Sequence, residues 1–351
     1  MKKTVILIGI LIWLGLAAVF TVFLVSGLSG SPAPGFLGHF TDGGWRNIQF
    51  GGTGEVLVRT ETFDSGGLEK LQLESRSQAV IVSFTDGDLI TVTQYGHEGA
   101  PAFTDTRSDR SLHISTPPVY SVGFFTMSFN PRLEVSLPRQ YKEAVEISAN
   151  SGTIRVNGDA EWGDVSLRAT SGSIRAEDSL RCAGLSVKTN SGSQHFGSVT
   201  AAAAEFSAIS GTIRLGDVMA EGMVSIEANS GAVHAGRLAA SDFAVKTSSG
   251  SIRLGELDGR GILRSTSGSI HAEAMTLRGD VTSESSSGSQ RLGLAKNASC
   301  RLELGVGSGS IHADGCRLSF DSRGKNATGT VGAGEDGTLK VVAASGSIRI
   351  N

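Results

Sequence analysis

The heptapeptide TSGSIRA at residues 170–176 decides the fold, because close variants of it recur throughout the second half of the chain. Each variant has a Ser-Gly or similar corner, a small residue, an apolar residue or Gln, and then Arg or His. The copies follow one another at about twenty residues, and only the last interval is nearly twice as long. The central glycines are Gly152, Gly172, Gly192, Gly211, Gly231, Gly250, Gly268, Gly288, Gly309 and Gly346.

Each unit has the pattern of two short strands joined at a corner. An alternating run such as VEISA precedes the Ser-Gly pair, and a second run such as SIRL follows it. Glycine is expected at the corner because it tolerates a positive φ, and the Ile that follows is expected to face the core. A fixed short period is typical of a solenoid, in which each unit buries its apolar face against its neighbours. With ATGTVGA around Gly329 as a degraded copy, about eleven coils are predicted in chain order.

Composition argues against several classes of protein, and the strand periodicity with its repeat predicts an all-β solenoid. The formal charge is −3, from 31 Lys+Arg against 34 Asp+Glu, so no general basic field favours nucleic acid. Cys182, Cys300 and Cys316 have no CxxC spacing, which argues against a disulfide framework or a zinc site. From residue 54 onward the periodicity is that of strands, and no convincing amphipathic helix is found.

The first residues have the pattern of a membrane anchor. Lys2 and Lys3 precede residues 5–25, a run without charge that is long enough to cross a bilayer as a helix. The two lysines favour a cytoplasmic N-terminus, so the rest of the chain is expected outside the cytoplasm of a bacterial cell. A cleaved signal peptide is the alternative, although its apolar region would usually be shorter.

Four regions are predicted. They are a transmembrane anchor at 1–28, a Gly/aromatic-rich spacer at 29–53, an N-terminal strand region at 54–144 and the regular repeats at 145–351. The spacer aromatics are interpreted either as a patch at the membrane surface or as side chains that pack on the first strands. Within 54–144, the Asp86-Gly87 pair in SFTDGDLITV predicts a hairpin turn, and Asp86 and Asp88 are assigned to that turn rather than to calcium.

In each repeat, the residue after the recurring apolar or Gln position is Arg or His, and together these residues form a column. Like charges on adjacent coils are destabilising, and from Arg175 to His312 a mostly neutral His separates each Arg from the next. The column is interpreted either as a solvated ladder whose alternation relieves repulsion, or as a cationic stripe for teichoic acid or acidic polysaccharide. In chain order it contains Arg155, Arg175, His195, Arg214, His234, Arg253, His271, Arg291, His312 and Arg349.

A resemblance to a known family follows from the segment LEVSLPRQYKEAVEISANSGTIRV at residues 133–156 and the successive SG-[ST]-I-R turns. These features resemble the DUF4097 family of adhesin-like bacterial β-strand-repeat proteins, over roughly residues 54–351. The resemblance implies a β-solenoid that is often membrane-anchored or envelope-associated. It implies no catalytic residues that could be transferred to this chain.

The sequence therefore predicts a non-enzymatic, single-pass, envelope-anchored structural or interaction protein without catalytic, cofactor-binding or metal-binding residues. Its expected partners are anionic cell-wall polymer or an envelope protein. The alternatives are an envelope-stress sensor or regulatory partner and, in another class, a carbohydrate-active β-helix enzyme. The segment GAGEDG at residues 332–337 is expected to be a loop between coils. Self-association through exposed strand edges is also expected unless the ends are capped, with Arg349 and Asn351 blunting the last edge.

Overall fold

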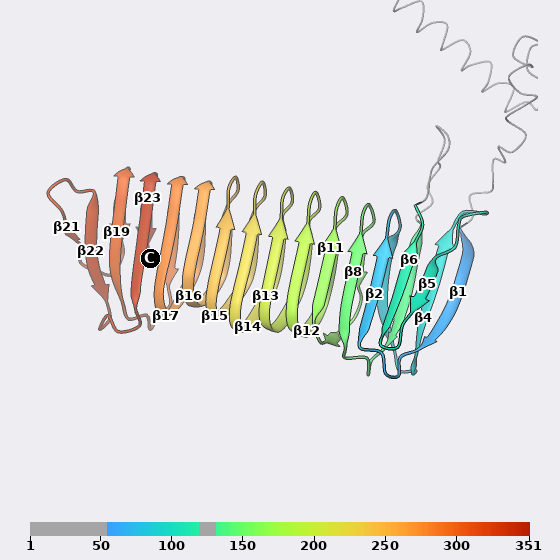
Figure 1. Ribbon diagram of the computed structural model, residues 1–351. Helices are drawn as coiled ribbons and strands as arrows, with labels where there is room; N and C mark the ends of the chain where they lie inside the picture. The colour runs from blue at the N-terminus through green and yellow to red at the C-terminus, as the bar shows by residue number, and fades with distance from the viewer. Residues whose placement is uncertain (1–54, 119–130) are drawn as a thin grey trace, which may run out of the picture. The chain divides into compact units, whose positions relative to one another are not determined.

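A computed structural model describes residues 55–118 and 131–351, and these residues form a 24-stranded sheet (Figure 1). The N-terminal strands are β1 (Val56–Asp64), β2 (Lys70–Ser75), β3 (Ala79–Thr85), β4 (Leu89–Gly96), β5 (Thr104–Arg107), β6 (Ser111–Thr116), β7 (Arg132–Pro138), β8 (Ala144–Ala149), β9 (Ile154–Val156), β10 (Ala160–Trp162) and β11 (Val165–Ala169). The long central strands are β12 (Ile174–Thr189), β13 (Gln194–Ala208), β14 (Ile213–Ala228), β15 (Val233–Thr247), β16 (Ile252–Ser267) and β17 (Ile270–Ser287). The C-terminal strands are β18 (Gln290–Leu294), β19 (Cys300–Ser308), β20 (Ile311–Ala313), β21 (Ser319–Phe320), β22 (Asn326–Val331), β23 (Thr338–Ser345) and β24 (Ile348–Ile350).

The predicted anchor at 1–28 and the predicted spacer at 29–53 lie outside the described residues. Among the residues that are described, no helix is long and apolar enough to cross a membrane.

Parallel pairing across the Ser-Gly corners builds two long rows of strands (Figure 1). The incoming row, which leads into the corners, consists in spatial order of β6, β2, β8, β11, the second parts of β12 to β17, β23 and β19. The outgoing row, which leaves the corners, consists of β7, β3, β9, the first parts of β12 to β17, β18, β24 and β20. Both lists contain twelve strands, so the described stack has twelve layers. The β6–β7 and β2–β3 layers precede the repeats, so the repeats form ten layers, against the eleven or so expected.

The core lies between the two rows and is formed by the alternate, inward-facing side chains. The predicted Ile rung is confirmed, since Ile154, Ile174, Ile213 and Ile252 are all fully buried. A third, shorter row begins at β10, which pairs with residues 180–182 of β12, and it continues through the middle parts of β13 to β17 along the central layers. The sequence therefore predicted the repeating unit correctly, although its strands continue into the next coil rather than ending after the outgoing segment.

Glycine is required at the corners mainly because successive layers approach closely. A Cβ placed on Gly172 would lie 1.8 Å from the carbonyl oxygen of Gly152, and one on Gly192 would lie 1.8 Å from that of Gly172. The expectation of a positive φ holds in this column only for Gly268, Gly288, Gly309 and Gly346. For the six earlier corners that expectation was wrong, and the contact with the carbonyl oxygen of the previous layer is the reason for glycine.

The last repeat is inserted between earlier layers instead of following them. On one side β23 pairs with β17, and on the other side it pairs with β19, while β24 lies between β18 and β20. The corner glycines show the same order, because a Cβ on Gly346 would meet the Gly288 carbonyl oxygen and one on Gly309 would meet that of Gly346. Arg349 therefore lies inside the stack, and the prediction that it blunts the final edge was wrong.

The predicted degraded coil at Gly329 is also corrected. Gly329 belongs to β22, which runs antiparallel to β19 with Leu302 opposite Gly329, and β21 continues this cap. The chain then passes back through residues 332–337, which form the expected loop. Ser299 anchors this loop, since its Oγ accepts hydrogen bonds from the Ala333 and Glu335 amides and its own amide donates to Asp336 at 2.8 Å.

A similar insertion occurs near the start of the described stack. The β2–β3 layer lies between the β6–β7 layer and the β8–β9 layer. Strand β7 pairs with both β3 and β4, parallel to the first and antiparallel to the second. The runs on either side of Asp86-Gly87 therefore do not form the predicted two-stranded hairpin, because β7 lies between them.

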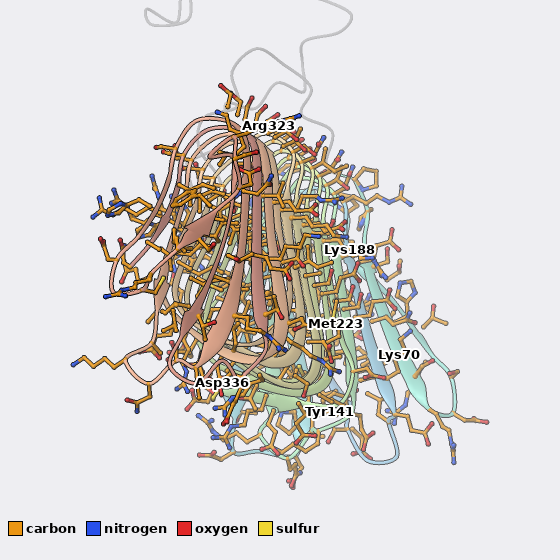
Figure 2. All side chains as sticks on the ribbon, turned by 90° about the vertical axis from the view of Figure 1, so that its left-hand side faces the viewer. Lys70, Tyr141, Lys188, Met223, Arg323 and Asp336 are labelled. Atoms are coloured by element: carbon orange, nitrogen blue, oxygen red, sulfur yellow. The ribbon has the colours of Figure 1, made fainter. Side chains whose placement is uncertain are left out.

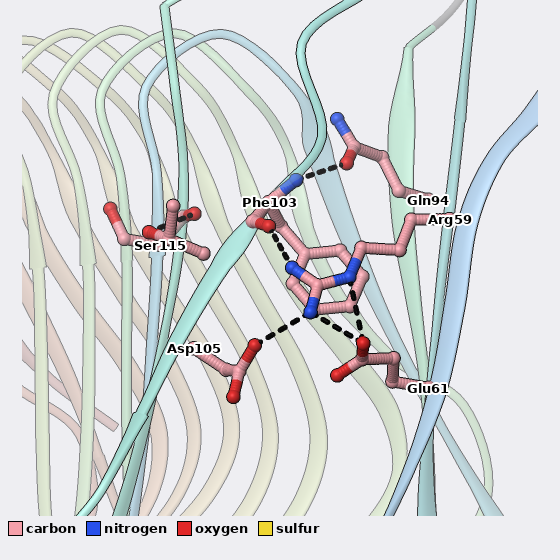
Figure 3. Close-up of polar contacts among 7 residues, drawn as sticks. Arg59, Glu61, Gln94, Phe103, Asp105 and Ser115 are labelled. Atoms are coloured by element: carbon pink, nitrogen blue, oxygen red, sulfur yellow. Dashed lines mark hydrogen bonds and ion pairs between the residues drawn. The ribbon is translucent and has the colours of Figure 1, made fainter.

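An aromatic side chain closes the core beneath the first layer (Figure 3). Phe103 is 1% exposed, and the Arg59 guanidinium lies 4.4 Å from the centre of its ring. Arg59 also donates to the Phe103 carbonyl oxygen and to Asp105, the latter at 2.8 Å, while Gln94 accepts a hydrogen bond from the Phe103 amide. Antiparallel pairing of β5 with β6 and of β1 with β4 completes this cap. These contacts cap the stack at its β6–β7 end, whereas the sequence alone did not show whether the ends are capped.

The corner contacts predict a steric penalty for Gly211→Ala. The added Cβ would lie 2.1 Å from the Gly192 carbonyl oxygen, so the layers must separate at this corner. We expect a loss of about 1–3 kcal/mol in the free energy of unfolding, the usual range for overpacking, measured by urea denaturation. Gly163→Ala is the control, because its Cβ would approach backbone no closer than 3.4 Å. Equal stabilities of the two variants would show that the corner contact does not constrain the stack.

The insertion of the last repeat predicts a specific effect of truncation. A chain ending at residue 337 lacks β23 and β24, which leaves the partner edges of β17 and β19 unpaired. We expect a lower melting temperature, partly restored by adding a synthetic peptide of residues 338–351. A truncated chain that melts like the full chain would mean that β17 and β19 pair directly when the insertion is absent.

Candidate functional site

The ten predicted Arg and His residues form one continuous column on the outer face of the outgoing row. Strand register places Arg175 beside His195, His195 beside Arg214, and Arg214 beside His234. The column continues through Arg253, His271 and Arg291 in the same way. We refer to these ten residues as the Arg/His column.

The order at one end of the Arg/His column differs from the prediction. Arg349 lies between Arg291 and His312, because β24 is inserted between β18 and β20. The predicted alternation of Arg and His holds from Arg175 to Arg291 and fails at the Arg291–Arg349 contact. Arg155 and Arg175 are likewise adjacent, so two arginines meet near each end of the column.

Five of the six arginines in the Arg/His column carry positive charge that no described carboxylate neutralises. All the arginines of the column are exposed. Among the described residues, Arg349 is the only arginine of the column with an ion pair, to Asp314 at 3.0 Å, and the His312 ring lies 2.7 Å from the same carboxylate. Within residues 55–118 and 131–351, the remaining five arginines form no ion pair: Arg155, Arg175, Arg214, Arg253 and Arg291.

Elsewhere on the stack, cations are paired with acids from adjacent layers. On the face of the incoming row, Lys246 lies 3.3 Å from Glu227 and Lys188 lies 3.1 Å from Glu205. Near the end of the third row, Arg260 pairs with Asp242 at 2.8 Å and Arg278 with Asp258 at 2.7 Å. The same parallel stacking could thus place acids beside the Arg/His column, and its charge is a property of the sequence rather than of the fold.

One histidine of the Arg/His column, His234, responds to its cationic neighbours. The pKa of His234 is lowered, first by burial and then by the charges of Arg253 and Arg214. A neutral His234 relieves the repulsion that a third adjacent cation would create. This supports the first sequence interpretation, that alternation relieves repulsion, without removing the cationic character of the face.

Two flanking columns were not singled out in the sequence. Immediately before the buried rung is a column of mostly hydroxyl side chains that includes Ser193, Thr212, Ser251 and Ser269. Two residues after each Arg or His, four successive layers have glycine: Gly197, Gly216, Gly236 and Gly255. A Cβ at Gly216 would lie 2.3 Å from the Gly197 carbonyl oxygen, so these glycines have the same packing origin as the corners. They leave a strip of bare backbone beside the cations.

Two shallow grooves lie on other faces. The larger, of about 980 Å³, runs along the third row and is lined by Trp162, Met219 and several alanines together with paired charges. The second, of about 760 Å³, lies on the incoming-row face, where Lys70 and Met223 line it (Figure 2).

Three carboxylates in these grooves have lowered pKa values. Lys142 lowers the pKa of Glu161, and Arg278 lowers that of Asp258. In the second groove, Lys70, Gln72 and Arg168 lower the pKa of Glu146 to about 2. Burial raises the pKa of the Cys182 thiol, in the larger groove, to about 12. Glu161, Asp258 and Glu146 are therefore not raised carboxylic acids, and the Cys182 thiol is not activated. The described residues contain no group of three or more His, Cys, Asp or Glu that could hold a metal ion.

Comparison with solved structures returns three proteins of low sequence identity. A candidate adhesin from Parabacteroides merdae is 12% identical, over 86% of this chain and 98% of that chain, with a TM-score of 0.43. A candidate adhesin from Bacteroides fragilis is 12% identical, over 84% and 97%, with a TM-score of 0.37. A candidate cell adhesion protein from Clostridium sporogenes is 12% identical, over 85% and 99%, with a TM-score of 0.27. No curated protein matches the sequence.

The comparison with protein families is more decisive. The family described as Toastrack DUF4097 matches residues 68–223 and again residues 185–351. Together these matches cover both insertions and every layer of the stack from β2 onward. The chain therefore belongs to the DUF4097 (Toastrack) family, as its repeat motif indicated.

Proposed function

We propose that this protein is a non-enzymatic, adhesin-like protein of the bacterial cell envelope, and that it binds anionic cell-wall polymer along the Arg/His column. The observation that carries the proposal is the row of five exposed arginines without an acidic partner among the described residues. The sequence pattern of residues 1–28 supports an uncleaved anchor with the stack outside the cytoplasm.

A linear polymer suits the shape of this site. Layers repeat at about 4.8 Å, so the column offers a straight row of donors that a globular or small ligand could engage only in part. Arginine binds phosphate and carboxylate through two parallel hydrogen bonds, and it remains charged at any physiological pH. Adjacent hydroxyl groups add further donors, and the bare backbone at Gly216 and its neighbours gives a chain room to lie beside the arginines.

The grooves support the non-enzymatic part of the proposal. Glycoside hydrolysis commonly requires a carboxylic acid with a raised pKa beside a second carboxylate. In this chain the pKa values of Glu161 and Asp258 are lowered by their cationic partners. These groups favour a structural role over proton transfer, which weighs against the β-helix enzyme alternative.

The proposal predicts that neutralising three arginines of the Arg/His column weakens binding to cell walls. The variant is Arg175→Gln, Arg214→Gln, Arg253→Gln, measured by co-sedimentation with purified walls before and after removal of teichoic acid. At about 0.2–1 kcal/mol for each exposed charge pair, losing three arginines should weaken binding roughly tenfold at low salt. Binding by the unaltered protein should itself decrease as salt is raised.

The matched control removes the same charge from the opposite face. Lys188→Gln, Lys246→Gln, Arg264→Gln alters three exposed cations of the incoming row, each paired with a glutamate. This control should bind walls like the unaltered protein. Equal loss in both variants would reduce the effect to net charge, and wall binding that is insensitive to teichoic acid would direct the search to a protein partner.

A pH-dependent stability follows from the same column when no polymer is present. Because the pKa of His234 is lowered in the fold, the unfolded chain binds more protons as the pH falls through its ordinary value of about 6.5. The stabilisation is therefore complete above that value and is lost below it. We expect a lower melting temperature at pH 5.5 than at pH 7.5, with a smaller decrease in His234→Gln. Identical decreases in both proteins would assign the effect to other groups.

A further inference from the structure

We infer, on the basis of the proposed polymer site, that the Arg/His column selects its ligand by linear charge density and that His195, His234 and His271 change this selection with pH. Near neutral pH the column favours a polymer with widely spaced anionic groups. In acid it favours one with closely spaced anionic groups.

The register of the central layers sets the two charge spacings. Between Arg175 and Arg291, every second layer carries Arg and every intervening layer carries His. With neutral histidines, fixed charges recur at about 10 Å, which exceeds the screening length of about 8 Å in physiological salt. Each arginine then acts almost independently on an anionic group. Protonation of the histidines halves the spacing to about 5 Å, and an anion can then be matched at every layer.

Each of these three histidines lies between two arginines of the Arg/His column. His195 lies between Arg175 and Arg214, His234 between Arg214 and Arg253, and His271 between Arg253 and Arg291. The lowered pKa of His234 agrees with this arrangement.

Acidic groups on the same face lie at the borders of this segment. Glu177 is two residues beyond Arg175, and Glu273 is two residues beyond His271, whereas the corresponding positions in the layers between them are glycines. One column further out, Asp217, Arg237 and Glu256 lie in register, with Arg237 and Glu256 paired at 3.6 Å. The central histidine, His234, thus has cations as its immediate neighbours, and a dense polyanion would supply the missing counter-charge.

Binding and protonation are consequently linked. A polyanion that places a negative group beside each histidine raises the pKa of that histidine, and the added proton in turn strengthens binding by the same factor. A polymer whose charges are two layers apart contacts the arginines alone and gains little from acidification. The change in selection with pH is therefore measured by the ratio of the affinity for the densely charged polymer to the affinity for the sparsely charged one.

The test uses two polymers with the same backbone and different charge density. Chondroitin carries one carboxylate per disaccharide, and chondroitin sulfate adds a sulfate to it. Affinities are measured at pH 7.5 and pH 5.5 at constant salt for the unaltered protein and for His195→Gln, His234→Gln, His271→Gln. The control is His113→Gln, which removes a histidine on the incoming row beside Glu74.

We expect the affinity ratio of chondroitin sulfate to chondroitin to rise roughly tenfold from pH 7.5 to pH 5.5 in the unaltered protein and in His113→Gln. In the triple variant the ratio should stay nearly constant. An unchanged ratio in the unaltered protein, or an equal rise in the triple variant, would overturn the inference while leaving polymer binding intact. If neither polymer binds at either pH in low salt, the proposed function fails as well.

Discussion

The close contact between a corner glycine and the carbonyl oxygen of the previous corner is the constraint on which the rest of the structure depends. At Gly172 and Gly192 no side chain fits, because a Cβ would lie 1.8 Å from the oxygen of the neighbouring layer. Each corner therefore aligns with the next, and the strands on both sides pair without a change of register. That alignment brings Arg175 directly beside His195 and makes a continuous column out of residues twenty positions apart in the chain.

The repeating unit could be predicted from the sequence because its signals are local. Alternation of Ile174 with Arg175 sets which side chain faces the core, and the Ser-Gly pair marks the corner. The family resemblance at residues 133–156 and the membership of the Arg/His column followed from the same local signals. The sequence could not show why glycine occupies the corners, because a close approach between layers and a positive φ both favour glycine.

The order of the layers could not be predicted, because each repeat carries nearly the same pairing surface as every other. Nothing within the last repeat shows whether it should pair with β17 or with β19. Outside that repeat, one residue could indicate where the insertion occurs: Gln290 in β18 replaces the usual buried apolar residue and is 1% exposed. Its amide donates to the Val342 carbonyl oxygen of β23 at 2.6 Å, and its side-chain oxygen accepts from Ser283. A buried amide must find such partners, so it marks the joint where the inserted strand fits.

Gln290 alone, however, is an ambiguous signal. Gln194 also replaces the rung, yet its layer is regular, with its amide donating to Ser207 of the next layer in chain order. The insertions are better understood through the ends that they create. By placing β23 inside the stack, the chain leaves β19 outermost, where β22 can turn back antiparallel and cover its edge. In a strictly sequential stack, β23 would pair with the edge of β19 that β22 covers here. The cap on β19 and the continuous column therefore have one origin, because interchangeable layers allow β22 to cover the β19 edge without interrupting the row of cations.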